Sequence, residues 1–152
     1  MNIRKATEND IEALLILERQ CITPPWTEGA LLSEIYNNDT VFLVSERQGE
    51  DAGQIAGFAV LRLIGEDAEL FQIVTDPNYR REGIATHLLN QVIKDAKNTG
   101  VTRLFLEVRV SNDATIALYE RFGFTSISLR KLYFIEPIED ARVMMLEIKD
   151  EW

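Results

Sequence analysis

The sequence predicts a mixed α/β (α+β) fold in which helices flank a central mixed β-sheet. Apolar strand patterns at 68–75 and 102–109 enclose an amphipathic helical pattern over 84–98, and this connection is long enough for a right-handed crossover between parallel strands. Extended segments on both sides of this unit make the sheet mixed. At 152 residues, with no repeat or linker, the chain predicts a single domain spanning 1–152.

The N-terminal segment is predicted to supply one strand and two helices. Residues 1–6 read as a short strand. Thr7 and Asp10 resemble a capping box, with Asp in place of the usual Glu or Gln, and the helix that follows runs to about Gln20. Two consecutive prolines end that stretch because proline cannot continue a helix, and Thr27 can cap a second helix.

Two hairpins are predicted around the central unit. The first joins 41–46 to 54–64 through a polar connection, and the second joins 124–134 to 141–148. A short helix over 113–122 lies between the central unit and the second hairpin.

Composition limits the partners of the protein. The sequence has 16 Lys plus Arg against 25 Asp plus Glu, a formal charge of −9, which argues against direct nucleic-acid binding and favours a cationic partner. With one Cys and one His, a disulfide framework or a zinc site is excluded, and no metal is expected; Cys21 is expected to pack and His87 to face solvent. The apolar runs are too short to span a membrane, so we expect a cytoplasmic protein.

The turn before the helix at 84–98 has the chemistry of an anion site. Gly83 lets the backbone approach a ligand closely, and the amides of 81–86 point out of the helix N-terminus, where the dipole favours an anion. Arg80 and Arg81 add positive charge, as a pyrophosphate requires. The pattern Arg-x-x-Gly-x-Ala is short, and an ordinary strand-to-helix turn is the alternative; its position between an apolar strand and a periodic helix favours the binding site.

The stretch from 73 to 85, Ile-Val-Thr-Asp-Pro-Asn-Tyr-Arg-Arg-Glu-Gly-Ile-Ala, resembles motif A of the GNAT superfamily of N-acetyltransferases. The order of elements also matches that fold along essentially the whole chain. The resemblance implies acetyl-CoA as co-substrate, with the pantetheine arm along the main chain of Ile73, Val74 and Thr75. It also implies that the CoA pyrophosphate is held by the turn and first helical residues Arg80, Arg81, Glu82, Gly83, Ile84, Ala85 and Thr86.

A second set of motifs is more specific. The segment Leu-Glu-Val-Arg-Val-Ser-Asn at 106–112, followed by Leu-Tyr at 118–119 and Gly-Phe at 123–124, is similar to the RimI group of ribosomal-protein N-terminal alanine acetyltransferases. Further matches are Arg130, Tyr133, Glu139, Asp140, Ala141 and Met144. The resemblance implies that Glu107 is the general base, Tyr119 the general acid and Asn112 a CoA contact.

Each of these three roles has a structural alternative. Glu107 follows an apolar run typical of a strand covered on both faces, and so lies near the strand end where ligand crevices form; the alternative is an ion pair with Arg109 on the same face. Tyr119 can instead pack in an amphipathic helix. Asn112 can cap the helix at 113–122, which is compatible with a CoA contact.

The acceptor side is less defined by the sequence. Trp26, with Tyr133 and Phe134, can line an acceptor cleft or can simply pack. The RimI group usually has Tyr-Tyr at the positions of Tyr133 and Phe134. The phenylalanine at 134 therefore lacks a hydroxyl that the group usually has. Glu139 and Asp140 are candidate contacts for a basic peptide, and a solvated loop is their alternative.

Together these features predict an acetyl-CoA-dependent N-terminal protein acetyltransferase, acting on a basic, ribosomal protein by direct transfer. Glu107, through water, takes a proton from the amine, and Tyr119 protonates the departing thiolate. An α-amino group, with pKa about 7.7–8.0, is roughly 3–4 kcal/mol easier to deprotonate at neutral pH than a lysine near 10.4. Acetylation of a protein lysine or a small amine, and a non-catalytic CoA-binding module, are the alternatives.

Overall fold

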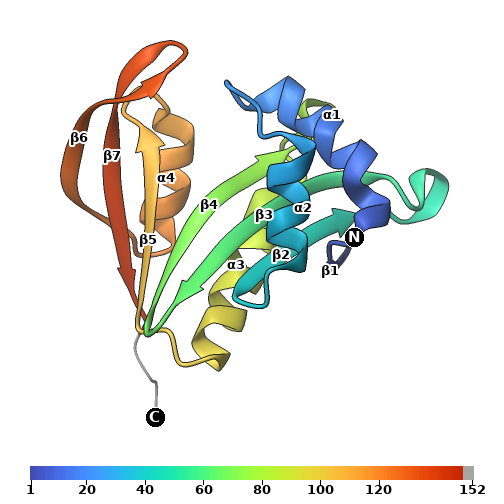
Figure 1. The fold of residues 1–152 in the computed structure, drawn as a ribbon, viewed down its shortest axis with the longest axis horizontal. Helices are drawn as coiled ribbons and strands as arrows, with labels where there is room; N and C mark the ends of the chain where they lie inside the picture. The colour runs from blue at the N-terminus through green and yellow to red at the C-terminus, as the bar shows by residue number, and fades with distance from the viewer. Residues whose placement is uncertain (149–152) are drawn as a thin grey trace.

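The computed structural model describes residues 1–148 and places seven strands in one sheet, in the order β1-β2-β3-β4-β5-β7-β6 (Figure 1). The strands are β1 (Asn2–Lys5), β2 (Thr40–Glu46), β3 (Ile55–Ile64), β4 (Asp67–Thr75), β5 (Arg103–Arg109), β6 (Thr125–Ile135) and β7 (Ile138–Glu147). The helices are α1 (Ile11–Cys21), α2 (Glu28–Tyr36), α3 (Ile84–Asn98) and α4 (Asp113–Arg121). The expected mixed sheet flanked by helices is therefore confirmed.

Local sequence signals account for the first helices. The backbone N–H of Thr7 donates to Asp10 Oδ2 at 2.8 Å, which is half of the predicted capping box. Thr27 Oγ1 accepts from the N–H of Ala30 at 3.1 Å and begins α2 as expected. The helix α3 has the predicted bounds, and the strands on either side of it, β4 and β5, are parallel.

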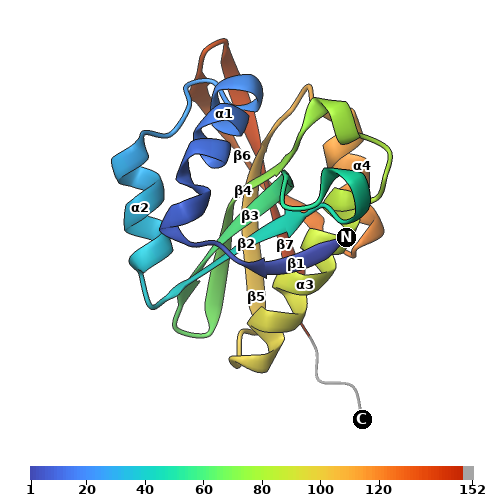
Figure 2. The same ribbon diagram turned by 90° about the vertical axis from the view of Figure 1, so that its right-hand side faces the viewer.

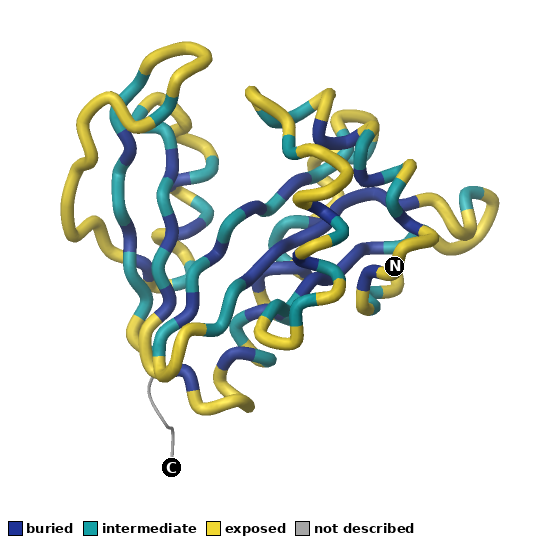
Figure 3. Tube along the Cα trace, viewed as in Figure 1, coloured by how far each residue is buried: buried dark blue, intermediate teal, exposed yellow. Residues whose placement is uncertain are grey.

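The helices cover the two faces of the sheet in separate layers (Figure 2). On one face, α1 and α2 pack over β2, β3 and β4, and their core contains Leu14, Leu31, Phe42, Phe58 and Val60. On the other face, α3 and α4 enclose a core that contains Leu88, Leu89, Leu104, Leu106, Ile116 and Tyr119. Burial is therefore concentrated in the middle of the sheet, with yellow, exposed segments at the loops and the outer strand β6 (Figure 3).

A bulge in β4 opens the sheet between its parallel strands. Val60 of β3 pairs with Gln72 while Leu61 pairs with Leu70, so Phe71 is an extra residue in β4. The β4–β5 register ends at the same level, at Leu70 and Leu106, and beyond it the two strands diverge (Figure 1). Because a bulge bends its strand, it accounts for this divergence.

The divergence also changes the environment of the predicted buried run before Glu107. Leu104 and Leu106 are buried against the α3 side, but Phe105 is only half-buried on the opposite face. The expectation that both faces of this run are covered is therefore wrong for Phe105, because α1 and α2 lie over β2 to β4 rather than over β5. Within residues 1–148, none of the helices combines the length and the apolar character needed to cross a membrane.

Candidate active site

The turn between β4 and α3 combines two left-handed residues with two exposed arginines at a helix N-terminus. Gly83, with φ of 78°, directly precedes α3, and Arg81 is also left-handed, with φ of 68°. A left-handed conformation costs a non-glycine residue roughly 1–2 kcal/mol, so the surrounding contacts must hold this turn in place. Arg80 and Arg81 are exposed beside the helix N-terminus, whose first amides have no intrahelical acceptor.

Gly57 brings the turn close to the sheet, and sequence reasoning missed it. A Cβ at this position of β3 would lie 2.6 Å from the carbonyl oxygen of Val74 and 2.9 Å from Cγ2 of Ile84. The start of α3 therefore approaches the β3–β4 backbone at a distance that only glycine allows. The available signal was a glycine inside an otherwise apolar strand, which often marks close backbone approach.

The segment Ile73, Val74 and Thr75 lies beyond the last β4–β5 pair. Its other edge is bonded to β3, with Gly57 opposite Thr75. The edge that faces β5 is therefore outside the ladder, and its peptide groups are positioned to bond an extended polar ligand between the strands. Asn112 lies at the start of α4, where its Oδ1 accepts from the N–H of Thr115 at 3.3 Å, so the capping alternative is realised.

Glu107 lies immediately after the last residue of β5 that pairs with β4. Its side chain is 14% exposed, and Arg130 Nη1 donates to its Oε1 at 2.7 Å. The Glu107 carboxylate, together with burial, raises the pKa of the nearby Tyr133 hydroxyl to about 12. Strands β5 and β6 thus place a carboxylate, a guanidinium and a neutral phenol together.

The alternative ion pair between Glu107 and Arg109 is wrong. Arg109 reaches the end of the β6–β7 hairpin instead, where Nη1 donates to the carbonyl oxygen of Pro137 at 2.8 Å and contacts Glu139 Oε1 at 3.3 Å. Its Nη2 also donates to the carbonyl oxygen of Thr23 at 3.4 Å. Arg109 therefore links β5 to the β6–β7 hairpin and to the segment between α1 and α2. The ion-pair partner of Glu107 is Arg130.

Glu69 is a second carboxylate on the same side of the sheet, and sequence reasoning missed it. It lies opposite Phe105 in the β4–β5 register, and Glu107 follows two residues further along β5. Burial is the main cause that raises the pKa of Glu69, the charge of Glu107 raises it further, and Arg130 opposes both. A charged residue in an apolar strand, on the face of Glu107, was the signal that could have identified it.

Tyr119 lies on the other side of β5 from Glu107. It is 5% exposed and belongs to the core cluster that contains Leu104 and Leu106, with its ring 5.5 Å from that of Phe124. Burial raises the pKa of its hydroxyl, which therefore stays protonated and able to donate a proton or a hydrogen bond. The packing alternative is thus realised, and the two predicted catalytic residues lie on opposite faces of β5.

The aromatic candidates for the acceptor cleft come from two different elements. Trp26, in the α1–α2 connection, is half-buried and packs edge-on against Phe71 of the bulge, with ring centroids 6.1 Å apart. Tyr133, on the β6–β7 hairpin, packs edge-on against Phe134 at 5.1 Å and lies under the guanidinium of Arg130 at 4.6 Å. Both residues have packing contacts, and both lie on elements next to the Glu107 face.

Glu139 and Asp140 do not lie in a solvated loop. Strand β7 begins at Ile138, three residues earlier than the predicted start at 141, because the hairpin pairing continues to its tip. Glu139 Oε2 accepts from the N–H of Ser111 at 2.7 Å, and this hydrogen bonding keeps the pKa of the carboxyl low. Asp140 Oδ1 accepts from the N–H of Leu132 at 2.9 Å, so both carboxylates hold neighbouring segments.

His87 and Cys21 occupy the environments that the sequence predicted. His87 is exposed on α3, with Nδ1 2.7 Å from the carbonyl oxygen of Gly83. Cys21 is half-buried and packs against the core beneath α1 and α2, where burial raises the pKa of its thiol. Within the described part of the chain, no three His, Cys, Asp or Glu side chains are grouped as metal ligands would be.

Comparisons with known proteins agree with this arrangement. Residues 11–124 match the model of the acetyltransferase (GNAT) family. The chain is 35% identical over 141 residues to ribosomal protein bS18-alanine N-acetyltransferase of Escherichia coli K12, covering 91% of this chain and 92% of the relative. It is 37% identical over 138 residues to the protein of that name in Haemophilus influenzae, covering 89% and 90%.

A solved structure extends the likeness to the whole described fold. The crystal structure of the ribosomal-protein-S18-alanine N-acetyltransferase from Escherichia coli aligns with a TM-score of 0.88 at 32% identity. The alignment covers 99% of this chain and 96% of that one. The likeness therefore covers the complete fold, including the divergent parallel strands and the turn before α3.

Proposed function

Because this chain belongs to the GNAT family of acetyltransferases, we propose that it acetylates the α-amino group of a ribosomal protein, with acetyl-CoA as donor. The relatives named as ribosomal protein bS18-alanine N-acetyltransferases support this acceptor. The observation that carries the proposal is the position of Glu107, which directly follows the last residue of β5 paired with β4, with Tyr119 on the other side of β5.

The donor side follows from the turn and the divergent strands. The first amides of α3, with Arg80 and Arg81, supply the partial and full positive charges that bind a pyrophosphate. Ile73, Val74 and Thr75 supply main-chain groups along the opening between the strands, which suit the amides of a pantetheine arm. Asn112, at the start of α4, is the further candidate contact for CoA.

Two protons leave the acceptor nitrogen as its ammonium group becomes an amide, and one proton must reach the thiolate. Glu107, directly or through water, takes a proton from the ammonium group, and the neutral amine attacks the acetyl carbonyl. When the C–S bond breaks, the protonated hydroxyl of Tyr119 donates to the sulfur, and the second proton, lost from the acceptor nitrogen as the amide forms, returns through solvent to the tyrosine oxygen. General acid–base catalysis of this kind contributes about 10²–10⁴-fold in rate.

The charge on the Glu107 face supports a cationic acceptor. Glu69 and Glu107 lie on this face, where Arg130 pairs with Glu107 and has a side chain that is 55% exposed. A positively charged N-terminus, followed by a basic peptide, is attracted to such a site, and the formal charge of −9 acts in the same direction at longer range. Trp26 and Tyr133 are positioned to flank the peptide, with Glu139 and Asp140 in the strand next to Tyr133.

The proposal is tested by locating the acetyl group on matched peptides. The purified chain is incubated with acetyl-CoA and basic peptides that begin with Ala, Ser or Met, and with an N-terminally blocked peptide that contains one internal lysine. Mass spectrometry is expected to place the acetyl group on the free N-terminus. Modification of lysine or polyamines alone contradicts the α-amino assignment, and CoA binding without turnover on any acceptor supports a non-catalytic module.

A further inference from the structure

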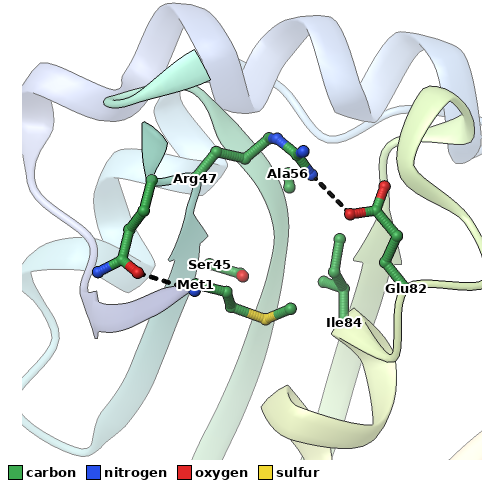
Figure 4. A pocket seen from close by; sticks show the side chains of 7 residues that line it. Met1, Ser45, Arg47, Ala56, Glu82 and Ile84 are labelled. Atoms are coloured by element: carbon green, nitrogen blue, oxygen red, sulfur yellow. Dashed lines mark hydrogen bonds and ion pairs between the residues drawn. The ribbon is translucent and has the colours of Figure 1, made fainter. Parts of the chain in front are cut away.

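Glu82 places a carboxylate in the turn that the proposed function assigns to a pyrophosphate. It directly precedes Gly83 at the N-terminus of α3, so an unpaired charge there would repel a bound anion. The carboxylate is paired, however, with an arginine from a distant part of the chain. Arg47 Nη1, in the connection between β2 and β3, donates to Glu82 Oε1 at 2.9 Å (Figure 4).

Arg47 makes a second contact with the same turn. Its guanidinium carbon lies 3.9 Å from the centre of the Tyr79 ring, and the Tyr79 hydroxyl donates to Gln54 Oε1 at 2.8 Å. Tyr79 and Glu82 are the residues on either side of the Arg80–Arg81 pair. One side chain therefore holds both ends of the segment that contains the left-handed Arg81.

Arg47 is itself anchored, and its Nε also lies 3.5 Å from Asp51 Oδ2, whereas Arg47 is the one side-chain partner of the Glu82 carboxylate among residues 1–148. The N–H of Arg47 donates to the carbonyl oxygen of Gln54 at 2.8 Å, and its own carbonyl accepts from the N–H of Gly53 at 3.1 Å. The ion pair to Glu82 spans a cavity of about 200 Å³ that Ser45 and Ile84 also line (Figure 4). Because a hollow lies beneath the pair, the position of Glu82 depends on Arg47 more than on packing.

We propose that Arg47 is a positioning residue for the pyrophosphate of CoA. Arg47 neutralises Glu82 and holds the turn so that Arg80 and Arg81 face the anion. This inference rests on the proposed function, since it assigns the turn to CoA. Arg47 acts through Glu82 and Tyr79 and not through a contact with the reacting atoms. Its removal therefore affects the binding of the diphosphate and leaves acetyl transfer at saturation unchanged.

The test is a double-mutant cycle on CoA affinity, measured by calorimetric titration of the full chain. Arg47→Ala is expected to raise the Kd of CoA about tenfold, which is the size of effect that one charge-assisted contact supplies. Glu82→Gln alone is expected to change it by about twofold or less. In the Glu82→Gln background, Arg47→Ala is expected to raise the Kd by only about threefold, because no carboxylate is left to neutralise.

Kinetics separate positioning from a general loss of structure. Arg47→Ala is expected to raise the KM for acetyl-CoA with kcat unchanged, and to leave turnover of S-acetylpantetheine, which lacks the diphosphate, at the wild-type value. Arg47→Lys, which keeps the charge, is expected to recover part of the affinity. An equal loss with S-acetylpantetheine, or no recovery by lysine, overturns the inference.

Arg103 provides the matched control. It also forms an ion pair, with Nε 3.0 Å from Asp67 Oδ1, and its guanidinium carbon lies 5.8 Å from the ring centre of Phe105. It lies at the start of β5, at the opposite end of the parallel strands from the turn, so Arg103→Ala is expected to leave the Kd of CoA unchanged.

The possible results distinguish two failures. If the wild-type chain binds no CoA, the proposed function is overturned and this inference with it. If the wild type binds CoA and Arg47→Ala has the same effect with and without Glu82, only the inference is overturned. Arg47 then acts on the ligand independently of the turn.

Discussion

The donor turn and the Glu107 face are built in opposite ways. The donor turn is formed by consecutive residues from Tyr79 to Thr86, and its chemistry comes from backbone amides, a left-handed glycine and two exposed arginines. The Glu107 face combines side chains of three strands, with Glu69 from β4, Glu107 from β5 and Arg130 from β6. One site is local in sequence and positive, and the other is assembled by the fold and carries more carboxylates than cations.

This difference separates what each site requires of the chain. A local turn needs a few residue types at fixed spacing, and under the proposed function substitutions there are expected to act mainly on donor binding. An assembled face needs correct strand register, and under the proposed function substitutions there are expected to act on the chemistry or on the acceptor. A substitution in the donor turn is expected to spare the Glu107 face, and a substitution on the Glu107 face is expected to spare donor binding.

Glu107→Gln is expected to give the largest effect. Loss of the general base should lower kcat by on the order of 10³-fold, with the Kd of CoA unchanged, because the carboxylate lies on the acceptor side of β5. Turnover is measured by release of free CoA, and affinity by calorimetry. Glu147→Gln, on the same sheet but at the far end of β7, is the control and should retain full turnover. Wild-type kcat in Glu107→Gln contradicts the assignment.

Tyr119→Phe is expected to give the second-largest loss of turnover. It should lower kcat by on the order of 10²-fold because the leaving thiolate loses its proton donor. Since the ring packing against Phe124 is kept, the melting temperature should change little. With a donor whose thiol is more acidic than that of CoA, the defect should shrink. A defect of equal size with both donors would assign Tyr119 to packing alone.

The sequence predicted the local site far better than the assembled one. The bounds of α3, the position of Gly83 and the two arginines are all contained in one short segment, where spacing and residue type are sufficient. Neither the Arg47–Glu82 pair nor the Arg130–Glu107 pair is local, since 35 and 23 residues separate their members. Such contacts depend on the complete sheet order.

The assembled face also depends on one irregular residue. Phe71 is an extra residue in β4, and nothing in the alternation of that strand distinguishes it from its neighbours. Without the bulge, regular alternation predicts Gln72 on the α3 side, whereas its side chain contacts Glu18 of α1. Strand identity was therefore predictable, and the opening between β4 and β5 was not.

Gly83→Ala tests the backbone character of the donor turn. A Cβ at φ of 78° costs roughly 1–2 kcal/mol, so the Kd of CoA should rise about tenfold if the turn relaxes, with kcat at saturation unchanged. Gly65→Ala is the control, because φ there is 62° and the added Cβ meets no atom within 4 Å. It should share the loss of stability without the loss of CoA affinity. A larger effect of Gly83→Ala on kcat than on the Kd of CoA would contradict the assignment of this turn to donor binding.

Glu69→Gln tests the charge of the acceptor face. Removing one carboxylate should raise the KM of a basic acceptor peptide about threefold and leave the KM of acetyl-CoA unchanged. Because burial and Glu107 raise the pKa of Glu69, the wild-type acceptor KM should increase as the pH falls through that pKa, while the variant should lack this dependence. The measurement is a pH series at fixed acetyl-CoA. A KM that is equal in both proteins at every pH would exclude Glu69 from acceptor binding.

Glu18→Gln is expected to have the smallest effect, and this effect is on the stability of the fold beneath Trp26. Glu18 is 0% exposed, its Oε1 accepts from the N–H of Trp26 at 2.8 Å, and its Oε2 has no hydrogen-bond partner among the described residues. Burial raises the pKa of this carboxyl, so the folded state retains a proton that the unfolded state releases. Wild-type stability should therefore fall as the pH rises from the unfolded pKa through the raised one.

The glutamine variant keeps the contact to Trp26 but carries no charge. At pH above the raised pKa it should be more stable than the wild type by about 1 kcal/mol in urea unfolding, and the difference should vanish at acidic pH. Glu12→Gln, an exposed position on the same helix, should show no such difference. A destabilised Glu18→Gln at neutral pH would mean that the charged carboxylate itself holds Trp26, and that the acceptor side depends on side-chain charge even in its core.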